Sequence, residues 1–200
     1  MINFFARVLS VILSPLILPT YGMIIALWTS SLSTIPTINR IAVTIMVFLF
    51  TNLLPAAIIA LLMRMKVITS WALPSKKERN IPFIVAILCY VSCTIYLANI
   101  MAPLWLLMFL IAATLTAITC GIINLWWKIS LHCAATAGVL GLALHIFSTS
   151  INTCNMLPII SIAILSLGAI ASARLFLERH TLAQVIAGSI VGFLWVYLLT

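Results

Sequence analysis

The sequence contains no aspartate and only two acidic residues, Glu78 and Glu178. Magnesium or calcium cages built from several carboxylates, and catalysis by a pair of carboxylates, therefore have almost no residues to draw on. Charged residues of both signs make up 6% of the chain, whereas soluble domains carry about 25%. Hydrophobic residues amount to 65%. This composition predicts an integral membrane protein and excludes disorder, a coiled coil and a secreted disulfide scaffold.

The five cysteines form no CxxC pair. Of the five cysteines, Cys89 and Cys93 are one helical turn apart, but this stretch lacks the other ligands that a metal site needs. We expect the cysteines to be small buried residues. The sequence therefore predicts no metal and no cofactor.

Long apolar runs separated by short polar breaks divide the chain. Windows of about 19 residues give seven apolar segments, at 8–29, 41–63, 82–99, 103–126, 132–149, 156–173 and 182–199. The break at 98–103 is brief and uncharged, so a kinked or re-entrant piece is possible there. Pro15 and Pro19 interrupt the first segment, which we expect to be retained rather than removed as a signal peptide. The prediction is an all-α integral membrane protein, a compact bundle of six to seven transmembrane helices in a single domain, 1–200.

Basic residues follow every second segment, so they gather on one side of the membrane. That side holds Arg7, Arg64, Lys66, Lys76, Lys77, Arg79, Lys128, Arg174 and Arg179, and the other side holds Arg40 alone. The positive-inside rule would make the basic side cytoplasmic. Alternatively, the cations converge to bind an anion such as phosphate. The net charge is +8, but the ten basic residues are scattered at the ends of the segments and form no dense basic face. Anionic lipid is therefore a better partner than nucleic acid.

Three short stretches on the basic side carry chemically useful residues: 75–82, 130–132 and 174–184. Lysine and arginine donate hydrogen bonds to phosphate oxygens. One histidine can attack phosphorus, and a second can protonate the departing oxygen. This set needs no metal, in agreement with the absence of aspartate.

These stretches resemble the motifs of the type 2 phosphatidic acid phosphatases (PAP2), which read KxxxxxxRP, PSGH and SRxxxxxHxxxD. Arg174 and His180 have the spacing of the third motif, and Ser130 and His132 keep two positions of the second. The first motif is compressed, with Lys76, Arg79 and Pro82 in the same order. The resemblance covers about residues 74–190 and is closest to a divergent bacterial membrane branch.

The resemblance implies a role for each matched residue. His180 would be the nucleophile that forms a phosphohistidine, and His132 the general acid. The phosphate would be bound by Lys76, Arg79, Ser130 and Arg174. Lys77 is an alternative to Lys76 because the motif spacing has changed.

Two positions depart from the third motif. Ala173 replaces its serine, and Gln184 replaces the aspartate that orients the nucleophilic histidine. If both lie in a helix, His180 and Gln184 share one face, so the amide oxygen of Gln184 could accept the imidazole N–H. A neutral amide supplies no negative charge to stabilise an imidazolium. We therefore expect slower catalysis or an altered pH profile.

Residues outside these motifs have structural interpretations. Trp126 and Trp127 are expected in an interfacial aromatic belt. Gly138 and Gly141 are expected to permit close helix approach, and His145 to take part in helix packing.

The sequence thus predicts a metal-independent phosphatase acting on a membrane lipid phosphate or diphosphate, in the inner membrane of a bacterium. The alternative is a catalytically decayed relative that binds anionic lipid or a partner. A transporter would line a path through its spans with polar residues, which are few here. The lipid, the side of the membrane that the site faces and the oligomeric state stay open.

Overall fold

In the computed structural model, residues 2–67 and 76–200 are described, with side chains from 4–67 and 81–200. Helices account for almost all of this part of the chain. They are α1 (Ile2–Ile12), α2 (Leu18–Thr29), η1 (Ser31–Thr34), α3 (Thr37–Phe48), η2 (Leu49–Leu53), α4 (Leu54–Arg64), α5 (Lys76–Asn99), α6 (Leu104–Asn124), α7 (Leu131–Ser148), α8 (Leu157–Phe176) and α9 (Leu182–Leu199). Six helical stretches in this part are long and apolar enough to cross a membrane. The all-α membrane bundle expected from the sequence is confirmed.

The first predicted span, 8–29, is not one helix. The chain leaves helical geometry between Ile12 and Leu18, around Pro15, because proline has no N–H for the helical ladder and clashes with the preceding turn. Tyr90 Oη donates a hydrogen bond of 3.1 Å to the Pro15 carbonyl, which satisfies one backbone group at the break. The interruption expected at Pro15 is thus found, but the segment 8–29 does not form a single span, because α2 is too short to cross a bilayer alone.

The second span contains a π-helical turn. From Thr37 to Arg64 it runs as α3, the π segment η2 and α4. Thr51, buried in η2, shares a hydrogen bond of 3.3 Å with Thr20 of α2. Pro55 follows within the first turn of α4, where a missing N–H is tolerated best. The apolar windows predicted a span here, but they did not predict the π-helical turn that shifts the helical register.

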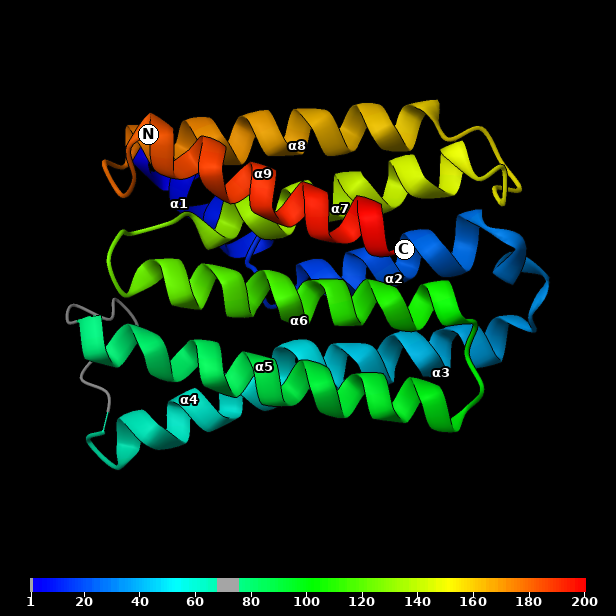
Figure 1. Ribbon diagram of the computed structural model, residues 1–200, viewed down its shortest axis with the longest axis horizontal. Helices are drawn as coiled ribbons and strands as arrows, with labels where there is room; N and C mark the ends of the chain where they lie inside the picture. The colour runs from blue at the N-terminus through cyan, green and yellow to red at the C-terminus, as the bar shows by residue number, and fades with distance from the viewer. Residues whose placement is uncertain (1, 68–75) are drawn as a thin grey trace.

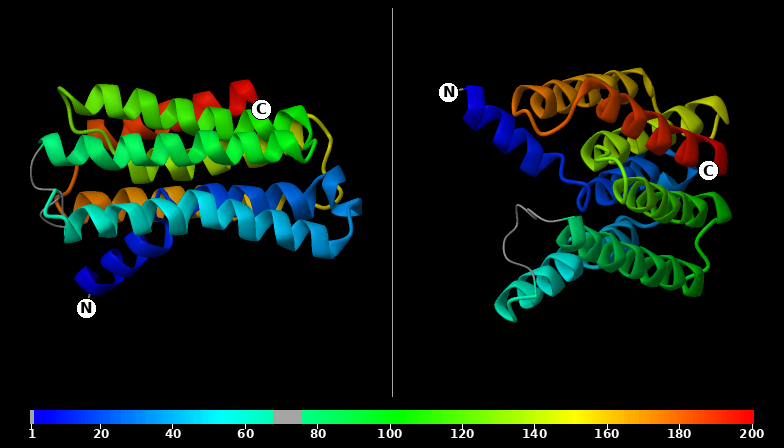
Figure 2. Two further views of the ribbon diagram at one scale, coloured as in Figure 1. Left: turned by 90° about the horizontal axis from the view of Figure 1, so that it is seen from below. Right: turned by 60° about the vertical axis from the view of Figure 1, so that its left-hand side comes forward.

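The helices lie roughly side by side, with α1 directed away from the bundle (Figures 1 and 2). The amino terminus, the end of α4, the start of α5 and the connections α6–α7 and α8–α9 lie at one end, and α2–α3, α5–α6 and α7–α8 at the other (Figure 1). The basic residues that the sequence placed on one side of the membrane, where they are described, therefore share one end of the bundle. Arg40 lies at the opposite end, over the Trp28 ring. This arrangement agrees with the alternation of basic and uncharged breaks.

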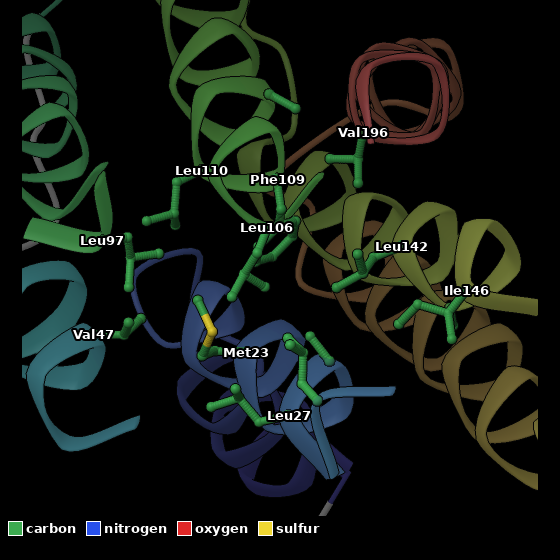
Figure 3. Packing of buried hydrophobic residues seen from close by; sticks show 14 of the residues in the cluster. Met23, Leu27, Val47, Leu97, Leu106, Phe109, Leu110, Leu142, Ile146 and Val196 are labelled. Carbon is green, nitrogen blue, oxygen red and sulfur yellow. The ribbon is translucent and has the colours of Figure 1, made fainter. Parts of the chain in front are cut away.

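The main core forms around α2. Met23 and Leu27 project from α2 among side chains of α3, α5, α6, α7 and α9 (Figure 3). Phe109 of α6 packs over Gly22, where an added Cβ would overlap its ring. Most side chains of this short helix are thus buried inside the bundle.

Helices α7 and α9 approach most closely. A Cβ at Gly141 would lie 3.1 Å from the Phe193 carbonyl oxygen, and one at Gly138 would lie 3.1 Å from Val196. The close approach expected at Gly138 and Gly141 is confirmed. On α9, Gly188 and Gly192 make room in turn for the backbone carbonyls of Ser130 and Ala134.

Candidate functional site

A cavity of about 1010 Å³ opens at the basic end and extends into the bundle. Its mouth is lined by Arg7, Lys128, His132, Arg174, Arg179 and His180. Deeper walls come from apolar residues such as Phe109, Ala113 and Val196. The stretch of α6 from Phe109 to Asn124 is about 22 Å long at 1.5 Å per residue. The cavity therefore joins a cationic mouth to an apolar interior that reaches well into the depth of a bilayer.

The end of α8 places Arg174 and His180 at this mouth. Arg179 N–H donates to the Arg174 carbonyl at 3.1 Å, and Glu178 N–H to the Leu175 carbonyl at 2.9 Å. These two bonds form a Schellman motif. Glu178 takes the left-handed position, with φ of 52°, where glycine is preferred because side chains are disfavoured there. The tight turn reverses the chain so that residues on both sides of it face one cavity.

His180 lies in the loop, immediately before α9. Thr181 caps α9 in a capping box with Gln184, whose Oε1 accepts the Thr181 N–H at 3.2 Å. The same Oε1 accepts from His180 Nδ1, also at 3.2 Å, because an amide oxygen can only accept. His180 lies before the first residue of α9, so the two residues do not share a helix face. The expected contact nevertheless forms, through the cap.

The electrostatic surroundings of His180 favour its neutral form. Burial, together with the positive charges of Arg174 and Lys128, lowers the pKa of His180 to about 4. The bonds to Gln184 and to the Lys128 backbone oppose this shift without cancelling it. With Nδ1 carrying the hydrogen, Nε2 of neutral His180 keeps a lone pair at pH 7.

His132 begins α7 and contacts α1. Its Nε2 donates to the Ser10 carbonyl at 3.2 Å, since a carbonyl oxygen can only accept. The half-buried His132 therefore has a partner from a segment far away in the sequence. His145, at the last turn of the same helix, lies at the other end of the bundle.

Ser130 lies behind the cavity rather than on its wall. The residue is fully buried and does not line the cavity. Its backbone docks on α9, with Ser130 N–H donating to the Gln184 carbonyl at 3.3 Å. The structure thus brings together His132, Arg174 and His180, with Gln184 behind His180, but does not turn Ser130 toward them.

The other predicted phosphate ligands, Lys76 and Arg79, have side chains outside the described residues. The nearby Pro82 and Phe83 of α5 do line the cavity. Within the described part of the chain, no three His, Cys, Asp or Glu residues are grouped so that they could hold a metal.

Three cations at the mouth were not among the predicted site residues: Arg7, Lys128 and Arg179. The alternation of charges had placed all three on the basic side. Their place in the cavity depends on contacts between distant segments, which periodicity and motif spacing do not report.

The family model described as the PAP2 superfamily matches residues 124–200. No match was found among curated proteins or among solved structures. The matched region begins after the compressed first motif and includes His132, Arg174 and His180 together with the α7–α9 pair. Over residues 124–200, which are less than half of the chain, the protein is similar to the PAP2 superfamily.

Proposed function

We propose that the protein hydrolyses the phosphate or diphosphate of a membrane lipid through a phosphohistidine at His180. The similarity of residues 124–200 to the PAP2 superfamily supports a phosphatase-type activity, and six long apolar helices support an integral membrane protein in contact with lipid. The observation that carries the proposal is the joining of two histidines and several cations to an apolar cavity in one site. The headgroup would lie at the mouth, with a lipid chain inside.

In the first step, Nε2 of His180 attacks phosphorus and the bond from phosphorus to the leaving oxygen breaks. His132 donates a proton to that oxygen, and Arg174 stabilises the charge on the remaining phosphoryl oxygens. In the second step, water attacks the phosphohistidine while His132 takes its proton. The bond between phosphorus and Nε2 of His180 breaks, phosphate leaves, and both histidines return to their starting protonation states.

The residues do not select among phosphatidate, phosphatidylglycerol phosphate, a polyprenyl diphosphate and a lipid A type phosphate. We expect detergent-purified protein to release phosphate from at least one of them, with the rate unchanged by EDTA because no metal takes part. A coupled assay of phosphate release over this panel is the test. Activity lost with EDTA and restored by a divalent metal would contradict the mechanism.

A second function, binding of anionic lipid without turnover, is favoured by one observation. Ser130, the motif serine, has its side chain buried away from the cavity walls. Saturable binding of the lipids by the folded protein, with no phosphate release from any of them across pH, would support this function instead.

The neutral Gln184 predicts a specific pH dependence. Gln184→Glu keeps the acceptor of His180 Nδ1 but adds a negative charge, so the pKa of His180 should rise from about 4. Because the nucleophile must be unprotonated, the acid limb of kcat/KM should move upward by roughly one pH unit or more. Above that limb we expect a faster rate, since the carboxylate stabilises the phosphorylated imidazole.

Profiles of kcat/KM for both proteins between pH 4 and 9 would measure this shift. Gln184→Leu is the control, since it removes the acceptor without adding charge and should slow the reaction throughout. If the acid limb of kcat/KM were the same in Gln184→Glu as in the unaltered protein, protonation of His180 would not be the cause of the loss of activity at low pH.

A further inference from the structure

We propose that Arg7, on α1, is an additional ligand of the substrate phosphate, and this inference rests on the proposed function. Arg7 lies outside the three motif stretches and outside the region matched to the PAP2 superfamily. It nevertheless lines the cavity mouth together with Arg174 and His180.

Contacts of α1 fix the position of Arg7 relative to the site. Ser10, whose carbonyl binds His132 Nε2 at 3.2 Å, is three residues further along α1 and also lines the cavity. Residues three apart share a helix face, with Cβ atoms about 5–6 Å apart. Arg7 therefore lies on the face that contacts His132, one turn nearer the amino terminus.

The neighbouring helices hold α1 in this place. Ala6 is buried, and α1 packs against α8, the helix that carries Arg174. Arg7 itself is exposed at the mouth, where its guanidinium remains available to solutes. Two arginines on adjacent helices thus border the entrance from different sides.

The charge balance at the mouth favours an anion. Among the lining residues whose side chains are described, Arg7, Lys128, Arg174 and Arg179 face a single acid, Glu178. Guanidinium groups bind phosphate oxygens with two parallel hydrogen bonds. Basic residues that served only to orient the protein in the membrane would not need this geometry. A headgroup that enters between α1 and α8 would be bound by both arginines.

Binding should be measured without turnover, in a His180→Ala background, with phosphatidate in detergent micelles as the probe. We expect Arg7→Gln to raise its Kd roughly tenfold, the usual effect of losing one charged hydrogen-bond partner. Arg64→Gln is the matched control, since Arg64 is an exposed cation at the same end that does not line the cavity, and it should change Kd little. Arg7→Lys should recover part of the affinity.

With His180 intact, Arg7→Gln should raise KM with little change in kcat, as expected when a contact acts equally on substrate and transition state. If α1 were merely displaced, His132 would lose Ser10 and kcat would fall instead, which would overturn the inference. Equal Kd values for Arg7→Gln and Arg64→Gln would also overturn it. Loss of turnover by itself tests the proposed function, because the binding measurement does not depend on catalysis.

Discussion

Replacing His180 with alanine should reduce phosphate release by about a thousandfold or more, the scale on which enzymes lose activity when a covalent nucleophile is removed. The variant keeps Arg174, His132 and the apolar cavity, so it should still bind the lipid. A coupled phosphate assay beside a binding measurement separates the two effects. The expected result is normal affinity with almost no turnover.

His145→Ala is the matched control, since it removes an imidazole at the opposite end of α7. We expect it to retain nearly full activity. Brief incubation of the unaltered protein with labelled substrate should also trap an acid-labile phosphoprotein that His180→Ala lacks. Comparable turnover in the two alanine variants would eliminate His180 as the nucleophile.

Gly192→Ala should destabilise the protein by about 1–3 kcal/mol or more, the usual cost of overpacking a close interface. An added Cβ would collide with the Ala134 backbone carbonyl, and backbone cannot rotate away as a side chain can. Helices α7 and α9 would separate, and with them His132 and the Gln184 cap. Thermal unfolding in detergent, followed by circular dichroism, measures the loss.

The control for this change is Gly168→Ala on α8, where an added Cβ meets nothing within 4 Å. Alanine has the higher helix propensity, so this variant should be as stable as the unaltered protein, or more stable by up to about 1 kcal/mol. Equal unfolding temperatures for both alanine variants would show that the α7–α9 contact does not limit stability.

The sequence predicted the features that depend on local composition. Apolar windows identified the six spanning stretches, and the spacing of Arg174, His180 and Gln184 indicated a contact that forms at 3.2 Å. Pro15 was recognised as an interruption, but not as the end of a helix. Proline can kink a membrane helix or end it, and the neighbouring segments decide which.

The orientation of Ser130 and the position of α1 could not be predicted. Ser130 is turned inward because Gly188 allows its backbone to dock on α9, a tertiary contact without a local signal. The bond between His132 and Ser10 joins residues 122 positions apart. Motif spacing describes neighbours along the chain and carries no information about such pairs.

The Schellman turn after α8 gives the two sides of the site different folding requirements. Arg174, His180 and Gln184 are ordered by bonds within one short stretch, so this side can form as soon as α8 and α9 are helical. The contact of His132 with Ser10 closes a long loop and requires α1 to have docked. Amide hydrogen exchange should therefore be slower in the α8–α9 turn than in α1. Opening of α1 would free His132 from its contact with Ser10, while His180 stays ordered.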